Sequence, residues 1–295
     1  MVEILEESGQ LVIRIGGQEA ARYLFGPSNW KPYLYPLRAA NGASLLANAP
    51  VDHRNHHGIW FGHGRVDDYD FWLERLGSGR IVHKKFDNIA SGGEVGSFTE
   101  QCEWVTQSGS VILTDTRTFT FYDTPPEARL FDIEIVLRAP AQTTVTLHPT
   151  NEAGLPCIRP AEGLAVRGGG QLTNSEGKHS EKEIRGQRAA WLDSSGKLGR
   201  QTGGIAVFDH PQNPDYPTPW FARDYGPFSP NFGRYAEEPI VLSSRKPLRL
   251  RYRIYAHSGD VTEGRVQAVW EEYRDTVQRG DGVAEKADRV LGVGR

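Results

Sequence analysis

Four of the nine histidines of the chain fall within eleven positions, at His53, His56, His57 and His63. The surrounding stretch, VDHRNHHGIWFGHGRVDDYDFW at positions 51–72, adds glycines, aromatic residues and aspartates. Imidazoles exchange protons near neutral pH, and an aromatic ring such as Trp60 can cover the apolar C–H face of a sugar. The stretch therefore indicates acid–base chemistry on a polyhydroxylated ring.

A transition metal is a second interpretation of the same histidines. On one extended strand, His57 and His63 would lie about 20 Å apart at roughly 3.3 Å per residue, too far for one ion. Glycines could fold the segment back, but a zinc site would still need a carboxylate from elsewhere. The spacing matches neither a metal-binding helix nor a zinc finger, so we expect no metal, and no other cofactor is indicated. A third interpretation is structural, with histidines stabilising a turn above an aromatic core.

Three other segments contribute candidate site residues. The sequence GIAVF at 204–208 predicts a buried strand that delivers His210 to its end, where a proline-rich loop begins. Glu152 is the preferred general base and His210 its competitor. His57 and His63 complete the predicted catalytic set. The residues predicted to contact the substrate are His53, His56, Trp60, Arg159, Asn174, Glu176, Trp220, Arg223 and Asp224.

The elements that must position these residues are mostly strands. The segments FDIEIVLRA at 131–139 and PLRLRYRIYA at 247–256 alternate apolar with polar residues, which is typical of strands with one face in the core. Thirty-three glycines and 18 prolines separate such segments. The pattern favours an all-β fold, a large antiparallel sandwich or barrel, in a single domain over residues 1–295.

One helix is predicted, near the C-terminus, in DVTEGRVQAVWEEYRDTVQ. Asp260 and Glu263 have the spacing of a capping box. The apolar residues that follow form one helical stripe, at Val266, Trp270, Tyr273 and Val277. We expect this helix to pack against the sheet.

On such a scaffold the catalytic residues should meet. They are placed at strand ends and glycine-rich turns, where a β fold presents its functional loops. We therefore expect one concave surface at the open end of the sandwich to carry His57, His63, Glu152 and His210. Two alternatives stay open: Arg223 and Asp224 pair only with neighbours, and Glu152 is a solvated loop carboxylate.

Charge and cysteine content restrict the class of protein. Lysine and arginine total 34 against 37 aspartates and glutamates, a net charge of -3, and neither sign forms a long run. We expect no nucleic-acid partner and no membrane association, and the acidic start MVEILEESGQ, which lacks the features of a signal peptide, favours the cytoplasm. Cys102 and Cys157 are expected to be reduced, buried thiols outside any metal site.

The chain resembles the PmoA-like family of bacterial proteins in five stretches: DHRNHHGIWFGHGRVDDYDFW, NEAGLPCIR, NSEGK, AAWLDSSG and GIAVFDHPQNPDYPTPWFARDYGPFSPNFG. That family takes its name from a membrane-embedded methane oxygenase subunit, yet this chain has no apolar run of the roughly 18 residues that a spanning helix needs. The resemblance implies a β-sandwich akin to the galactose-mutarotase-like supersandwich and a role in sugar catabolism. Asn151 stands where the family has a basic residue, which speaks against a lysine there and leaves Glu152 in place.

The leading hypothesis is an enzyme that performs epimerisation, elimination or hydrolysis on a sugar or an oxidised sugar. Its partner would be that small molecule; the sequence does not determine the oligomeric state. A non-catalytic carbohydrate-binding module is the first alternative, because the same aromatic rings and imidazoles could serve hydrogen bonding alone. A metal-dependent oxygenase or hydrolase is the second, with two imidazoles and a carboxylate as ligands.

Overall fold

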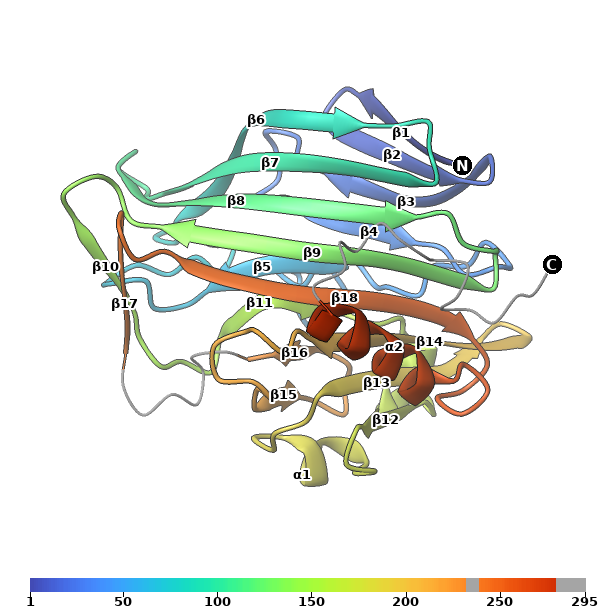
Figure 1. Cartoon of the computed structure of the whole chain (residues 1–295). Coiled ribbons are helices and arrows are strands. Elements are labelled where there is room, and N and C mark those ends of the chain that lie inside the picture. The colour runs from blue at the N-terminus through green and yellow to red at the C-terminus, as the bar shows by residue number, and fades with distance from the viewer. Residues whose placement is uncertain (232–238, 280–295) are drawn as a thin grey trace.

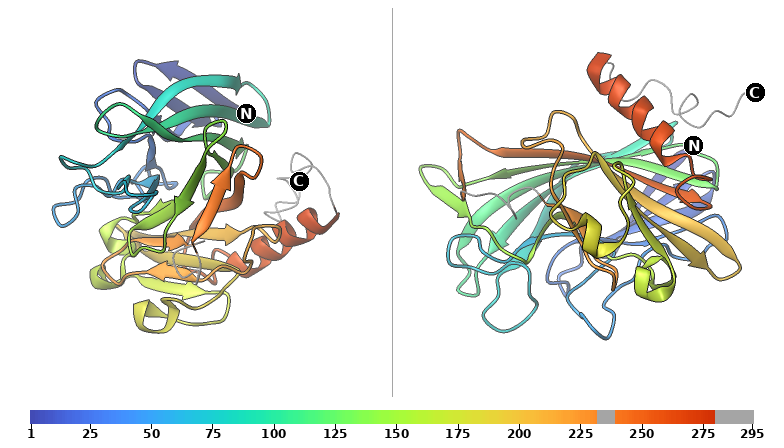
Figure 2. Two further views of the ribbon diagram at one scale, coloured as in Figure 1. Left: turned by 90° about the vertical axis from the view of Figure 1, so that its left-hand side faces the viewer. Right: turned by 90° about the horizontal axis from the view of Figure 1, so that it is seen from below.

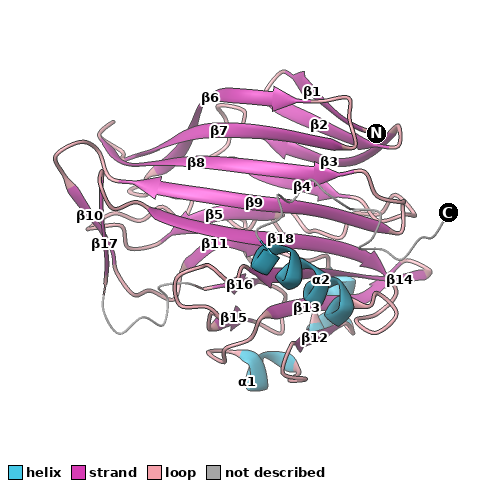
Figure 3. Ribbon diagram, viewed as in Figure 1, coloured by secondary structure: helices cyan, strands magenta, loops and turns pink. Residues whose placement is uncertain are grey.

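The structure, a computed structural model, describes residues 1–231 and 239–279. Within these residues the chain forms two large antiparallel sheets of eight strands each, stacked face to face (Figure 1). Figure 3 shows how little of the described chain is helical. The sandwich predicted from the alternation of apolar and polar residues is confirmed, whereas a single domain and the likeness to a mutarotase supersandwich stay predictions.

The first sheet combines the first five strands of the chain with three strands from later in the sequence. In spatial order its strands are β1 (Val2–Glu7), β2 (Gln10–Ile15), β3 (Gln18–Leu24), β4 (Tyr33–Leu37), β5 (Ile59–His63), β11 (Ala153–Ile158), β16 (Phe228–Pro230) and β15 (Trp220–Ala222). Long loops before and after β5 lie on the side of this sheet that faces away from the second sheet (Figure 2). These loops hold the histidine-rich stretch.

The second sheet combines the long central hairpins with the C-terminal strands. Its order is β12 (Gln171–Asn174), β13 (Trp191–Leu198), β14 (Gln201–Asp209), β18 (Leu248–Ser258), β9 (Ala128–Arg138), β8 (Val111–Tyr122), β7 (Val95–Val105) and β6 (Arg80–Ala90). The remaining described elements are β10 (Thr144–Leu147) paired with β17 (Ile240–Ser243), the short helices η1 (Glu162–Leu164), η2 (Val166–Gly168) and α1 (Ser180–Ile184), and helix α2 (Val266–Arg279).

The core lies between the two sheets. The predicted inward face of β9 is fully buried, at Phe131, Ile133, Ile135 and Leu137. On β18, Leu250 and Ile254 also enter this core, while Arg253 points to the outer face. That outer face is less exposed to solvent than the alternation predicts. Arg253 is only 3% exposed, and its guanidinium lies 4.3 Å from the ring of Tyr273 on α2.

Helix α2 covers the outer face of the second sheet (Figure 1). Its predicted apolar stripe is confirmed: Val266, Trp270 and Tyr273 are buried in one cluster with residues of β14 and β18. The capping pair also forms, because the Glu263 amide donates to Asp260 Oδ1 at 2.9 Å and the Asp260 amide donates to Glu263 Oε2 at 3.1 Å. It stabilises the turn before the helix, which begins only at Val266.

A charged network is buried between the sheets. Arg117 of β8 donates two hydrogen bonds to Asp115, at 2.8 and 2.9 Å, and Trp104 donates a third at 2.6 Å. From the first sheet, Tyr23 donates to Glu100 of β7 and accepts from Arg117 at 3.3 Å. Since buried charges are tolerated only when paired and hydrogen-bonded, this network links the two sheets as one unit.

A second buried ion pair joins β18 to β13. Nε2 of His257 lies 2.8 Å from Asp193 Oδ2, and both side chains are almost inaccessible. Gly264 makes room for the imidazole, since a Cβ there would lie 2.2 Å from its Nδ1. Burial lowers the pKa of His257, but the charge and hydrogen bond of Asp193 outweigh burial and raise the pKa above its usual value of 6.5.

This pair predicts a specific pH dependence of stability. A histidine whose folded-state pKa is raised contributes stability that is fully present below its unfolded pKa and is lost as the pH rises through the folded pKa. We expect the free energy of unfolding of the wild type, minus that of His257→Gln, to decrease between about pH 6 and about pH 9. Urea unfolding at both values measures it. An unchanged or increasing difference would contradict the assignment.

Two further expectations concern the membrane and the cysteines. In the described residues, no helix has the length and apolar character needed to cross a bilayer. Cys102 and Cys157 are both buried free thiols, as the sequence predicts.

Candidate active site

The histidine-rich stretch forms a cluster on the outer face of the first sheet. Because side chains alternate along β5, Ile59 and Phe61 enter the core and Trp60 points the other way. There Trp60 meets residues from β4, β11 and the loop that follows β5. We define the outer-face cluster as Lys31, Tyr33, His56, His57, Trp60, Trp72 and Glu74.

A glycine on β5 allows this cluster to form. Gly62 also faces outward, and a Cβ there would lie 2.9 Å from the backbone oxygen of Phe71 and 3.4 Å from Cε3 of Trp72. The loop after β5 can therefore lie flat on the strand, with the rings of Trp72 and Trp60 5.4 Å apart. Asp70 fixes the turn by accepting the amides of Trp72 and Leu73, and this turn delivers Glu74.

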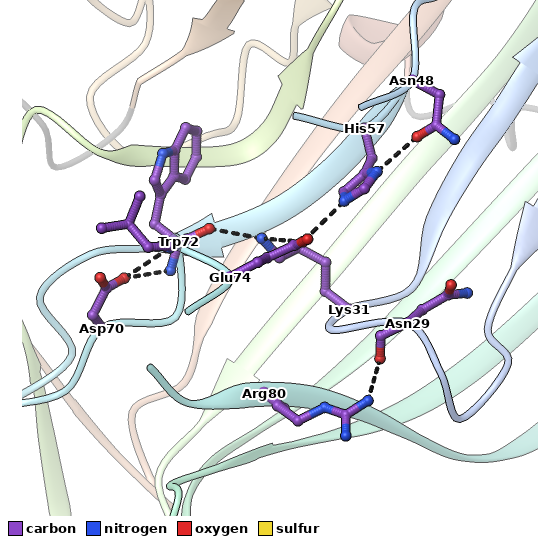
Figure 4. A network of polar contacts seen from close by, with 9 residues as sticks. Asn29, Lys31, Asn48, His57, Asp70, Trp72, Glu74 and Arg80 are labelled. Atoms are coloured by element: carbon purple, nitrogen blue, oxygen red, sulfur yellow. Dashed lines mark hydrogen bonds and ion pairs between the residues drawn. The ribbon is translucent and has the colours of Figure 1, made fainter. Parts of the chain in front are cut away.

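Glu74 lies at the centre of a polar chain (Figure 4). Its Oε1 is 2.9 Å from Nε2 of His57 and 3.0 Å from Nζ of Lys31. The other ring nitrogen of His57 is 2.6 Å from Oδ1 of Asn48, and the ring stacks on Tyr33 at 4.4 Å. Lys31 also donates to the backbone oxygen of Trp72 at 2.7 Å. His57 and Lys31 thus orient this carboxylate directly, and Asn48 and Tyr33 hold the imidazole in place.

Burial and pairing set the charges of this chain. Lys31 is 2% exposed, and burial lowers the pKa of its amine while the nearby Glu74 carboxylate opposes that shift. Burial raises the pKa of Glu74, but the hydrogen bond from His57 and the charge of Lys31 outweigh it, so the pKa of this carboxyl is lowered. Glu74 is therefore ionised at neutral pH. Within the described part of the chain, no hydrogen bond to its Oε2 is found.

His56 lies beside this chain in an aromatic stack. Its ring packs on Trp60 at 5.1 Å and on His53 at 4.5 Å. Nη1 of Arg159 donates to Nδ1 of His56 at 3.3 Å, while Nη2 pairs with both oxygens of Asp52. Burial, then the charges of His53 and Arg159, lower the pKa of His56 to about 2. The ring is therefore neutral, and with Nδ1 accepting, its hydrogen is on Nε2.

The predicted role of Trp60 as a stacking platform does not fit its burial. Trp60 is 0% exposed and lies beneath His56, so it presents no ring face to a ligand in this structure. His53 and Tyr225 are partly exposed and stack on each other at 4.9 Å. Trp60 positions the imidazole of His56 instead.

Tyr225 was not among the predicted site residues, although its neighbours were. Arg159 lies 5.2 Å from its ring centroid. The predicted Arg223 instead donates to Glu181 of α1 at 2.6 Å, and Asp224 accepts the Glu181 amide at 2.7 Å. Arg223 and Asp224 thus hold α1 against the loop between β15 and β16, as the pairing alternative anticipated, and Tyr225 reaches the cluster.

Two predicted catalytic residues lie together at the far end of β5. His63 is 2% exposed, and its Nδ1 accepts the Arg65 amide at 3.1 Å. Glu152 is exposed at the start of β11, and its backbone oxygen accepts the Gly64 amide at 2.7 Å. His57 precedes the opposite end of the strand. By the same alternation His63 lies on the inward side of β5 with Ile59 and Phe61, whereas Glu152 is exposed at the end of the strand pair; their catalytic roles stay predictions.

The expected meeting of all four catalytic residues is wrong for His210. This histidine packs edge-on against Tyr273 of α2 at 5.7 Å and borders a cavity on the second sheet. The strand GIAVF does deliver it to a strand end, but alternation directs it to the same outer face as Phe208, which also contacts Tyr273. A strand end can open to either side of a sandwich.

Three predicted substrate contacts lie outside the cluster for identifiable reasons. Trp220 is 0% exposed and belongs to the core between the sheets, where its Nε1 donates to the Ala189 oxygen at 2.8 Å. Oδ1 of Asn174 accepts the amides of Glu176 and Lys178, which closes a turn. Glu176 is exposed in that turn. In this structure, the buried Trp220 presents no stacking surface.

Lys31 and Glu74 were not among the residues predicted from the sequence. Glu74 comes two residues after the end of the histidine-rich stretch, in DFWLE, and Lys31 lies between two aromatic residues in NWKPY. A charged residue embedded among aromatic residues was the available signal. For metals, no group of three or more His, Cys, Asp or Glu side chains placed to hold an ion occurs among the described residues.

Comparison with known proteins gives a family and a distant structural likeness. No curated protein matches the chain. A solved structure described as "Putative kojibiose phosphorylase from human microbiome" matches with 9% identity and a TM-score of 0.37, covering 92% of this chain and 33% of that one. The chain thus spans about a third of that protein's length.

The resemblance to the PmoA-like family is corrected by the family comparison. The matching model is DUF6807, and nothing in the comparisons links the chain to PmoA. Phe232 and Gly233, which end the last of the five resembling stretches, lie outside the described residues. The DUF6807 match extends over residues 10–271, so the chain belongs to DUF6807, a family of unknown function.

Proposed function

We propose that the outer-face cluster binds a sugar or an oxidised sugar and transfers a proton on it. One observation carries the proposal: Glu74 is an ionised, largely buried carboxylate whose Oε1 is held by His57 and Lys31. Its Oε2, for which the described residues supply no hydrogen bond, is left as a proton acceptor. A base oriented in this way is the central requirement of acid–base catalysis.

The neighbouring groups supply the complementary donor. In the proposed step, Oε2 of Glu74 takes a proton from the carbon next to a carbonyl of the substrate. The electron pair of that C–H bond moves into a new C=C bond, and the carbonyl oxygen gains negative charge. Nε2–H of the neutral His56 stabilises this oxygen by donating a hydrogen bond. Delivery of a proton to the opposite face of the enolate by another group gives epimerisation, and departure of a group from the next carbon gives elimination.

The charge balance of the region favours a neutral, hydroxyl-rich ligand. Lys31 is paired with Glu74 and Arg159 with Asp52, so neither sign is in excess among these four. Hydroxyl groups both donate and accept, which suits a surface with both kinds of partner. The ring of His53 stacks on both His56 and Tyr225, so the partly exposed Tyr225 is the ring proposed to cover an apolar C–H face. His53 and Arg159 keep their proposed roles in substrate binding, through hydrogen bonds.

A non-catalytic sugar-binding module is the second candidate. It is favoured by the tight packing of the imidazoles, because His56 and His57 each already engage protein groups. Glu152 remains the rival base within the enzymatic proposal, since it lies exposed at the end of the same strand pair.

Hydrogen exchange on the substrate carbon tests the proposal. The wild-type protein is incubated in deuterated buffer with keto-sugars, free sugars and glycosides, and proton NMR follows each C–H signal. Protein-dependent loss of the signal next to a carbonyl, or formation of an epimer or an unsaturated product, would support it. Saturable sugar binding without exchange or turnover would favour the binding module. Absence of both binding and turnover would overturn both candidates.

A further inference from the structure

A cavity of about 460 Å³ lies on the outer face of the second sheet, beside α2. Its floor comes from β8, β9 and β18, including Thr120, Asp132 and Arg251, and its walls include Tyr273 of α2 and His210. Figure 1 shows α2 in front of β18 and β14, at one side of these strands. This volume is in the range of small-molecule sites in proteins, and the cavity is separate from the outer-face cluster on the first sheet.

Every charged group described in and beneath this cavity is paired with a group of opposite sign. Arg253 donates to both oxygens of Asp132, at 2.6 and 2.9 Å, and Tyr122 donates to the same carboxylate at 2.7 Å. One oxygen of Glu134 accepts a hydrogen bond from Arg251 at 2.7 Å, and the other oxygen pairs with the half-exposed Arg249. Because each carboxylate has a guanidinium partner, the floor is polar but does not favour a charged ligand.

Two wall residues present unused hydrogen-bonding groups. Nδ1 of His210 accepts the Gln212 amide at 3.0 Å, and burial lowers the pKa of His210 to about 4. The ring is therefore neutral at pH 7 and carries its hydrogen on Nε2, a donor. The hydroxyl of Tyr273 has no hydrogen-bond partner among the described residues, although the side chain is 2% exposed. Because Tyr273 borders the cavity, a ligand or water there can hydrogen-bond to this hydroxyl.

We infer that this cavity is a second ligand site, which binds a neutral polyhydroxylated molecule of the size of a mono- or disaccharide. The volume selects a small molecule, and because each charged group is already paired within the protein, a neutral ligand fits better than an ion. The alternation of carboxylate acceptors with guanidinium, imidazole and hydroxyl donors matches a ligand whose hydroxyls both donate and accept. The site does not depend on the proposed activity of the outer-face cluster.

Two substitutions on one strand face test the site. Thr116, Thr118 and Thr120 follow one another on the outer face of β8, but only Thr118 and Thr120 line the cavity. Thr120→Phe fills the cavity with a residue that strands accommodate, and Thr116→Phe adds the same ring outside it. Titration calorimetry with glucose, galactose, maltose and cellobiose, and with glucuronate as an anionic probe, measures affinity and the number of sites.

The expected result is saturable binding of at least one neutral sugar, weakened about tenfold or more by Thr120→Phe and unchanged by Thr116→Phe. Tyr273→Phe, which removes only the hydroxyl, should weaken binding about 3- to 10-fold. If the outer-face cluster also binds sugar, calorimetry should count two sites in the wild type and one in Thr120→Phe. If the outer-face cluster does not bind sugar, it should count one site in the wild type and none in Thr120→Phe. Equal affinity in Thr120→Phe and the wild type, tighter binding of glucuronate, or no binding would overturn the inference.

Discussion

Glu74→Gln is expected to lower the turnover of an identified substrate by about 10²–10⁴-fold, the usual cost of losing a general base. The amide keeps the shape of the side chain, and its oxygen can still accept from Lys31. It cannot take a proton from the substrate. Substrate affinity should change far less than turnover, because the other contacts persist. Steady-state kinetics combined with a direct binding measurement separates the two quantities.

Glu152→Gln is the matched control for this prediction. It makes the same chemical change in a glutamate that is exposed at the end of the same strand pair. Circular dichroism and urea unfolding must show that both variants fold, because Glu74→Gln also removes the counter-charge of the buried Lys31. Undiminished turnover in Glu74→Gln, together with a large loss in Glu152→Gln, would transfer the role of base to Glu152.

Arg117→Met is expected to reduce the free energy of unfolding by about 3–5 kcal/mol. Arg117 is 0% exposed, and its removal leaves the buried carboxylate of Asp115 without its cation, whereas Glu100 keeps His83 at 2.7 Å. Burial already raises the pKa of Asp115, and Arg117 opposes that shift. Loss of Arg117 should therefore make Asp115 bind a proton more readily. The destabilisation, measured by urea unfolding, should become smaller at acidic pH.

Arg249→Met is the control for the buried network. Arg249 also lies on a strand of the second sheet and pairs with a glutamate, but its side chain is 50% exposed. Exposed ion pairs contribute about 0–1 kcal/mol, so this substitution should have little effect. Similar losses in both variants would show that burial does not determine the cost of removing an arginine here.

The strands and the helix could be predicted because their signals are local. Alternation along β9 and β18 gave the buried faces correctly, and the stripe through Trp270 and Tyr273 gave the packed face of α2. Each pattern depends only on the period of its own element. The burial of Arg253 could not be predicted from its strand, because it results from helix α2, which comes later in the chain and packs over the sheet.

The site was predictable only in part because its geometry depends on pairing between distant segments. His53, His56 and His57 were found from their density in sequence, and Arg159 joins them because β11 pairs with β5. That pairing, and the position of Lys31, follow from strand register, which one sequence does not reveal. The predicted stacking role of Trp220 failed for a related reason. Its segment looks like a loop in the sequence, but Trp220 begins β15 and faces the core.

The double anchoring of Glu74 bears on the handedness of any product. A carboxylate that is held on one oxygen by an imidazole and an ammonium from different segments cannot turn freely about its last side-chain bond. Its remaining oxygen points in one direction, so in the proposed reaction it meets one face of a flat enolate and leaves the other face to a different group. Stereochemical choice is then made by the protein before the substrate arrives.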